Sequence, residues 1–99
     1  MSEEELITLF ELHCNEPNNF MDVAIKRSRR PDLHAFLLLD ELLPNPDERD
    51  LVSAAAHDEI YLDVSLSDLA AVITPSQVQE LVRCGVRASA EYGALCKFV

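Results

Sequence analysis

The chain has 99 residues, of which 48% are hydrophobic, and its 18 acidic and 8 basic side chains give a formal net charge of −10. This length predicts a single domain, residues 1–99, with a modest apolar core. The negative charge argues against direct binding to nucleic acid or to an anionic membrane, because both attract lysine and arginine. The same charge favours solubility and attraction to basic protein surfaces.

The cysteines and the absence of long apolar runs bear on location and cofactors. Cys14, Cys84 and Cys96 are an odd number without paired spacing, which argues against a disulfide framework and against a zinc site. The N-terminus is acidic and no signal peptide follows it. No apolar run approaches the ~20 residues of a membrane span. We therefore expect a cytoplasmic protein with reduced thiols, no bound metal and no cofactor.

Two helices are predicted at the start of the chain. The first covers residues 2–14 and begins with a capping box, in which Ser2 and Glu5 bond to each other's backbone amides. The second covers residues 20–30, with Asn19 as its cap. Basic side chains cluster at its end, where they suit the negative pole of a helix.

Two further helices are predicted before the middle of the chain. Residues 32–43 follow Pro31 and carry apolar side chains on much of the helix circumference, which is typical of a central core helix. Residues 47–56 are predicted as a short helix with Asp47 as its cap.

The segment HDEIYLDV, residues 57–64, is the most distinctive stretch of the chain. Ile60, Leu62 and Val64 alternate with Tyr61 and Asp63, which is the period of a half-buried strand. We predict a strand over residues 59–64 with an acidic approach.

The last third of the chain predicts two helices and a hairpin. A short helix capped by Ser65 or Ser67 is expected to end at Ile73, and Thr74 and Gln77 form a capping box for the next. Residues 86–89 and 94–99 are expected to form a β-hairpin, with Gly93 in its turn.

The predicted fold class is α+β, with four to six short helices packed on a small antiparallel sheet of three strands. Two strands alone would be marginally stable, so residues 59–64 are expected to pair with the C-terminal hairpin.

His57, Asp58 and Glu59 together suggest a metal-dependent hydrolase, because imidazole and carboxylate ligands suit divalent cations. The only other histidines are His13 and His34, and neither lies in a ligand motif. A solvated end of the preceding helix is therefore the favoured interpretation of this triplet.

Two clusters of charge remain. Basic residues gather at Lys26, Arg27, Arg29 and Arg30 without interleaved aromatic residues, which favours local pairing with carboxylates over phosphate binding. Residues 67–85 and the hairpin have the order of a winged helix-turn-helix, but the second helix is poor in positive charge for reading DNA.

The region from residue 40 to residue 63 holds eight carboxylates against one arginine. Such a surface can mimic a phosphate backbone and occupy a basic groove. The candidate partner-binding residues are Asp40, Glu41, Asp47, Glu48, Asp50, Asp58, Glu59, Tyr61 and Asp63, and no catalytic residue is assigned.

Residues 53–87 and the terminal segment EYGALCKFV resemble a family of small, uncharacterised phage and prophage proteins. The pattern pairs a HDEIYLDV segment with RCGVR and a C-terminal hairpin. The resemblance implies a phage protein in bacterial cytoplasm, without an assigned chemistry.

The leading hypothesis is a non-enzymatic protein that binds and inhibits or modulates a host protein with a basic surface, such as a nucleic-acid-handling or defence protein. One alternative is the small metal-dependent hydrolase centred on His57, Asp58 and Glu59. Another is a virion structural or assembly protein that forms homo-oligomers through the edge of the C-terminal hairpin.

Overall fold

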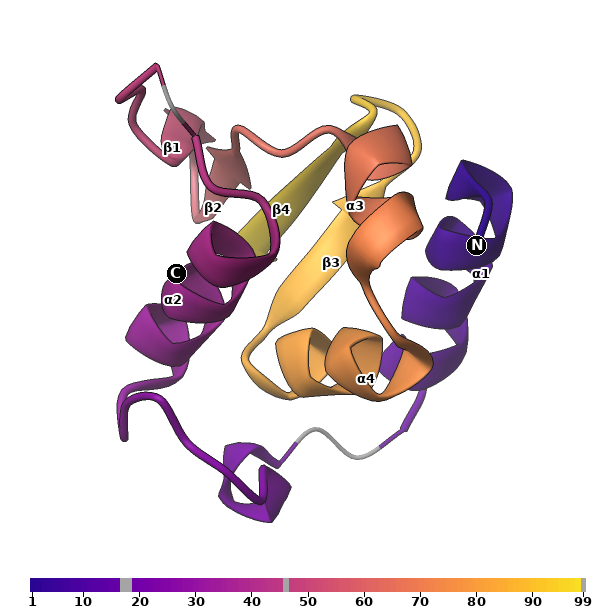
Figure 1. Cartoon of the computed structure of the whole chain (residues 1–99), viewed down its shortest axis with the longest axis vertical. Coiled ribbons are helices and arrows are strands. Elements are labelled where there is room, and N and C mark those ends of the chain that lie inside the picture. Colours follow the sequence, from indigo (N-terminus) through magenta and orange to yellow (C-terminus); the bar gives the residue numbers. More distant parts are fainter. Residues whose placement is uncertain (17–18, 46, 99) are drawn as a thin grey trace.

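The computed structural model describes residues 1–16, 19–45 and 47–98. Its elements in chain order are α1 (Glu3–Cys14), the 3-10 helix η1 (Phe20–Asp22), α2 (Pro31–Leu42), β1 (Val52–Ala56), β2 (Glu59–Leu62), α3 (Leu66–Val72), α4 (Pro75–Arg83), β3 (Val86–Ser89) and β4 (Ala94–Phe98). The four strands form one antiparallel sheet in the order β1–β2–β4–β3 (Figure 1). The predicted α+β class is confirmed, but the prediction of three strands is wrong.

The pairing predicted for the middle of the chain is present. β2 lies beside β4, with Tyr61 opposite Cys96 and Leu62 opposite Leu95. β4 also pairs with β3 to complete the C-terminal hairpin, in which Gly93 has a φ of 62°. Val99, the predicted last residue of the hairpin, lies outside the described residues.

Capping boxes begin α1 and α4 as predicted. The Ser2 hydroxyl accepts a hydrogen bond from the Glu5 amide at 3.1 Å, and the Glu5 carboxylate accepts one from the Ser2 amide. Thr74 and Gln77 make the same reciprocal pair at the start of α4, with distances of 3.2 and 3.0 Å. These bonds satisfy amides that have no partner inside the helix, so each helix begins where the sequence predicts.

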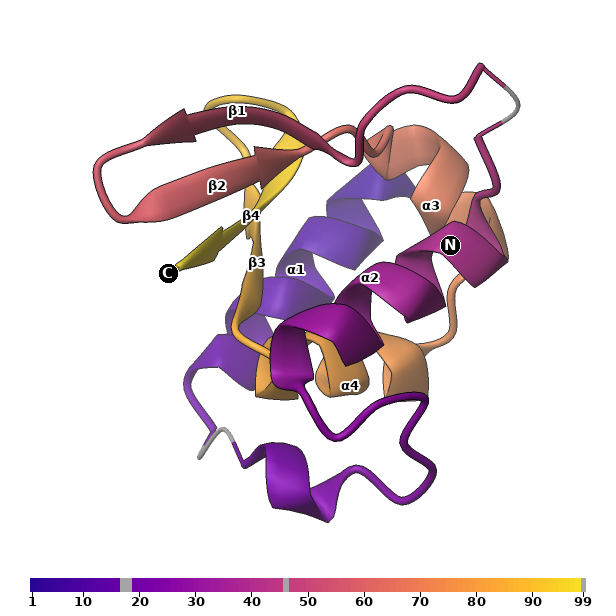
Figure 2. The same cartoon turned by 90° about the vertical axis from the view of Figure 1, so that its left-hand side faces the viewer.

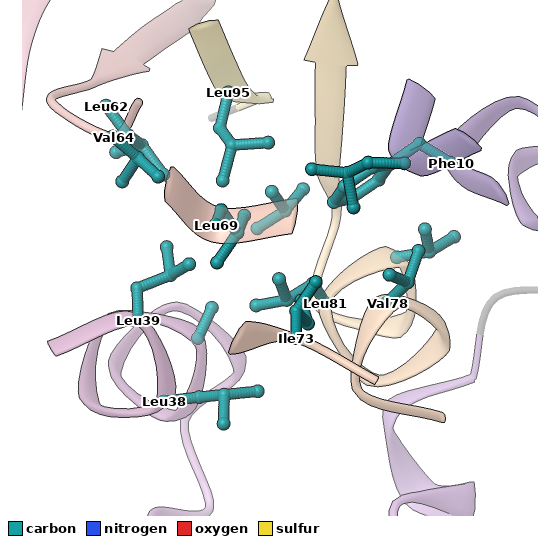
Figure 3. Close-up of a cluster of buried hydrophobic side chains, with 14 of the residues drawn as sticks. Phe10, Leu38, Leu39, Leu62, Val64, Leu69, Ile73, Val78, Leu81 and Leu95 are labelled. Carbon is teal, nitrogen blue, oxygen red and sulfur yellow. The ribbon is translucent and has the colours of Figure 1, made fainter. Parts of the chain in front are cut away.

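One cluster of buried apolar side chains joins the sheet to the helices (Figure 3). Leu62 and Leu95 extend from adjacent strands, and Leu39 of α2 and Leu69 of α3 pack in the same cluster. All four are at most 1% exposed. Figure 2 shows the helices gathered beside β3 and β4, while the β1–β2 hairpin extends away from them.

The prediction of a helix over residues 20–30 is wrong, because the backbone groups there bond outside a helix. Asn19 caps only the single turn of η1. The Val23 carbonyl accepts a hydrogen bond from Lys26 Nζ at 2.7 Å, and the Arg27 amide donates to His34 Nδ1 at 3.1 Å. In an α-helix this carbonyl and this amide would bond to each other.

The prediction of a helix over residues 47–56 is also wrong. Glu48 adopts a φ of 57°, in the left-handed region, which interrupts any right-handed helix at that point. Residues Val52–Ala56 then pair with β2. Alanine has a high intrinsic helix propensity. Here the pairing of Ala54–Ala56 with β2 outweighs that propensity.

The turn between β1 and β2 corrects the interpretation of His57 as the end of a helix. Ala56 pairs with Glu59, so His57 and Asp58 form a two-residue hairpin turn, and His57 has a φ of 57°. This conformation costs an ordinary L-residue ~1–2 kcal/mol and glycine much less.

The substitution His57→Gly should therefore raise the free energy of unfolding by about 0.5–1 kcal/mol, after allowing for the greater entropy of glycine in the unfolded chain. Urea unfolding measures the change. Asp58→Gly is the matched control, since Asp58 has an ordinary φ, and it should lower the free energy of unfolding by a similar amount. Equal effects of the two substitutions would contradict this account of the turn.

Candidate functional site

The structure divides the predicted acidic residues into separate groups. Asp40 and Asp63 lie on either side of one apolar hollow between α2 and the segment that follows β2. Asp47 and Asp63 line a second, adjoining hollow. Glu48 and Asp50 are exposed in the loop that leads to β1, and Asp58 is exposed at the hairpin turn. Glu41 lies elsewhere, beside Arg27.

The first hollow has a volume of about 310 Å³. Its walls are largely apolar and come from α2, the loop after it, and the residues that flank β1 and β2. Its apolar lining consists of Phe36, Leu37, Leu39, Leu43, Leu51 and Val64. Its polar lining residues are Asp40, Asn45, Arg49 and Asp63. The lining makes this hollow suited to an apolar side chain, and its polar groups are suited to charged or polar atoms beside that side chain.

Arg49 is the basic residue at the centre of this surface. Its Nε lies 3.2 Å from the Asp63 carboxylate. Arg49 also lines the second hollow, of about 240 Å³, together with Asp47, Asp63 and Asp68. Across the two hollows four carboxylates and one arginine line the surface, so its local charge is negative.

Glu41 pairs with Arg27 and so does not contribute a free carboxylate to the acidic surface. Arg27 Nε donates to the Glu41 carboxylate at 2.7 Å, and this contact holds the pKa of Glu41 below its usual value. Arg27 also lies 3.9 Å from Glu80, whose carboxylate bonds to His34. Local pairing, as predicted for the basic cluster, therefore holds for Arg27, although no helix end is present there.

His34 is fully buried and both of its ring nitrogens have partners. Nδ1 accepts the Arg27 amide proton, so in the neutral ring Nε2 carries the proton and donates to Glu80 at 3.0 Å. This histidine ties α2 to α4 and has no nitrogen left for a ligand. It is a structural residue.

His57, Asp58 and Glu59 do not form a ligand set. His57 and Asp58 are exposed at the end of the hairpin. Among residues 1–16, 19–45 and 47–98, no group of three or more His, Cys, Asp and Glu side chains is arranged to hold a metal ion. The described residues therefore supply no further metal ligands beside His57, Asp58 and Glu59, which the hydrolase alternative would need.

Glu59 and Tyr61 lie on the sheet face away from the Leu62 cluster. The Tyr61 hydroxyl donates to the Glu59 carboxylate at 3.3 Å, and the Tyr61 ring meets Tyr92 edge-on at 5.2 Å. Burial, with the adjacent Glu59 carboxylate, raises the pKa of Tyr61. The hydrogen bond and the ring contact hold the Tyr61 ring in place, and neither Glu59 nor Tyr61 lines the hollow beside α2.

Sequence reasoning missed Asp68, Asn45 and the apolar lining of the hollow. Asp68 belongs to α3, outside the acidic stretch, and comes near Asp47 only through the fold. No local pattern marks it. The apolar lining was assigned to the core, yet Leu37 is 41% exposed.

The chain matches no protein-family model, no curated protein and no solved structure. Within the described part of the chain, none of the helices has the length and apolar content needed to cross a membrane.

The three cysteines are free thiols of unequal burial. Burial, with a smaller contribution from the Glu80 carboxylate, raises the pKa of Cys84 from 9.0 to about 11. Burial also raises the pKa of Cys96. Protonated, buried thiols are poor nucleophiles, so neither cysteine is a candidate for catalysis.

Between pH 9 and about 11, the thiol of Cys84 ionises in the unfolded chain and stays protonated in the folded one. The stability that Cys84 contributes is present below pH 9 and is lost as the pH rises through this window. Raising the pH from 9 to about 11 should therefore lower the free energy of unfolding by about 2–3 kcal/mol through Cys84. Urea unfolding across the window measures it.

In Cys84→Ala the decline over the same window should be shallower than in the wild type, whatever the stability at neutral pH. Cys14→Ala is the control for removing a less buried thiol and should keep the wild-type slope. An unchanged slope in Cys84→Ala would contradict the assignment.

Proposed function

We propose that this protein acts by protein–protein interaction, through the acidic surface formed by the C-terminal half of α2, the loop to β1 and the β1–β2 hairpin. The observation that carries the proposal is an apolar hollow with carboxylates around it. Asp40 and Asp63 line this hollow, and Asp47 lines the adjoining hollow together with Asp63. The partner is a protein with a basic surface, and binding inhibits or modulates it.

Charge supports this choice of partner. Asp40, Asp47, Glu48, Asp50 and Asp58 make no ion pair within the described residues. Such carboxylates attract a basic surface at long range and speed the encounter, in a manner that salt weakens. A groove that binds nucleic acid is a basic surface of this kind.

The hollow supports a specific rather than a purely electrostatic contact. Interfaces take most of their affinity from a few side chains that fill pockets, with charged residues around them. Leu37 and Phe36 offer that pocket beside Asp40. An apolar side chain of the partner would fill the pocket, and lysine or arginine residues beside it would pair with the carboxylates.

The resemblance of the HDEIYLDV and RCGVR segments to phage and prophage proteins implies a partner in a bacterial host, such as a nucleic-acid-handling or defence protein with a basic groove. We include inhibition of such a partner in the proposal. The protein would then act as a nucleic-acid mimic and would need no catalytic residue of its own.

Neutralising the acidic surface should weaken partner capture. The test compares the wild type with a variant carrying Asp40→Asn, Asp47→Asn, Asp50→Asn and Asp58→Asn, each immobilised and exposed to bacterial lysate at low salt. Wild-type protein should retain one or more basic proteins that elute as salt is raised. The variant should bind a purified partner on the order of tenfold or more weakly, because steering and local pairing are both lost.

The matched control carries Glu3→Gln, Glu4→Gln, Glu11→Gln and Glu91→Gln, which give the same net charge from exposed positions elsewhere. It should capture the same partner as the wild type. Equally weakened binding in both variants would show that net charge, not this surface, determines binding, and would contradict the proposal. Retention that does not depend on salt, or no retained basic protein, would contradict the proposal.

A further inference from the structure

β1 is an edge strand with an open side. In the order β1–β2–β4–β3, which covers the described residues, β1 has β2 as its only neighbour. Alternate residues of such a strand turn their N–H and C=O groups away from the partner strand. Ala56 and Glu59 close the two-residue turn as a bonded pair, so by alternation Ala55 directs its N–H and C=O outward.

The side chains of β1 leave this edge accessible. All five residues, Val52–Ala56, are exposed, and none is charged or larger than valine. The opposite edge strand, β3, is buried or half-buried along its length and packs against α1 and α4. Proteins commonly protect an edge with lysine, proline or a covering element. β1 has only a bulge between Val52 and Ala54.

Acidic residues lie at both ends of this edge. Asp50 precedes β1, and Asp58 and Glu59 follow it across the turn. Leu51, the residue directly before the strand, lines the apolar hollow beside α2. An extended segment placed along β1 would therefore meet backbone groups in its middle, carboxylates at its ends and a pocket beside the start of β1.

Charge disfavours pairing of the open edge of β1 with a second copy of this chain. A two-fold antiparallel pair centred on Ala54 would place Asp50 of one copy alongside Asp58 of the other at both ends. Like charges directly opposite one another destabilise a strand pair, and each copy carries a net charge of −10. A basic segment would place positive side chains beside Asp50 and Asp58, so these contacts would be attractive.

We propose that β1 binds an extended, basic segment of another protein by strand addition, so that the segment becomes a fifth strand of the sheet. Backbone hydrogen bonds along Val52–Ala56 supply affinity, and lysine or arginine side chains beside Asp50 and Asp58 supply the choice of partner. This inference rests on the proposed function and specifies how the partner is held.

The probe is a short synthetic peptide in which lysine and valine alternate, with binding followed by fluorescence anisotropy. Ala55→Pro removes one outward N–H and is compatible with an edge position, whereas Ala55→Val keeps the N–H. Ala55→Pro should bind the peptide about tenfold more weakly, as expected for one lost hydrogen bond, and Ala55→Val should bind like the wild type. Circular dichroism checks that both variants are folded.

A second arm leaves the protein unchanged, so it does not depend on how Ala55→Pro folds. A peptide with an N-methyl group on every residue has no backbone N–H to donate to β1 from either of its edges, and it should bind wild type at least about tenfold more weakly than the parent peptide. The Ala55 amide should gain protection from hydrogen exchange when the parent peptide binds. Equal binding of both peptides, or no added protection, would overturn strand addition.

Failure of this inference is distinguishable from failure of the proposed function. Loss of partner binding in the four-fold asparagine variant, combined with wild-type binding of the peptide by Ala55→Pro, would overturn the edge site and leave the acidic surface standing. A dimer of wild-type protein that Ala55→Pro dissociates, seen by sedimentation, would assign the edge to a second copy and also overturn the inference.

Discussion

The fold depends on β2 being paired on both sides. One side of β2 bonds to β1 and the other to β4, so a strand of four residues joins the middle of the chain to its C-terminus. Its Leu62 enters the apolar cluster beside Leu95, and this fixes the register, because a shift by one residue would expose Leu62. With β2 held in this way, its acidic neighbours Asp58 and Asp63 occupy set positions at opposite ends of the strand.

That constraint explains how one surface can be both apolar and acidic. The segment after β2 brings Asp63 and Val64 against α2, where Leu39 packs into the core and Asp40, the next residue, faces solvent. Arg49 from the loop before β1 pairs with Asp63, and both residues line the hollow. An exposed ion pair contributes little to stability, so its principal effect is to position the loop.

Local signals in the sequence predicted most of the elements, and the failures have physical causes. Ser2, Ser65 and Thr74 sit where their hydroxyls cap helices, and such caps act over three residues. Ala54–Ala56 carries no comparable signal, since alanine prefers a helix in isolation and became a strand only through pairing with β2. The candidate site was predicted in part: Asp40, Asp47 and Asp63 converge, but the pairing of Glu41 with Arg27 and the approach of Asp68 depend on contacts distant in sequence.

The central claim is that the acidic surface between α2 and the β1–β2 hairpin is where the protein meets its partner. The most direct measurement is a backbone NMR titration of labelled protein with the basic partner retained from lysate. The account predicts that the resonances that shift or broaden cluster within residues 36–64 and around Asp68. Changes confined to residues 20–30 or to the exposed face of α1, with the region from Asp40 to Asp63 unaffected, would contradict it.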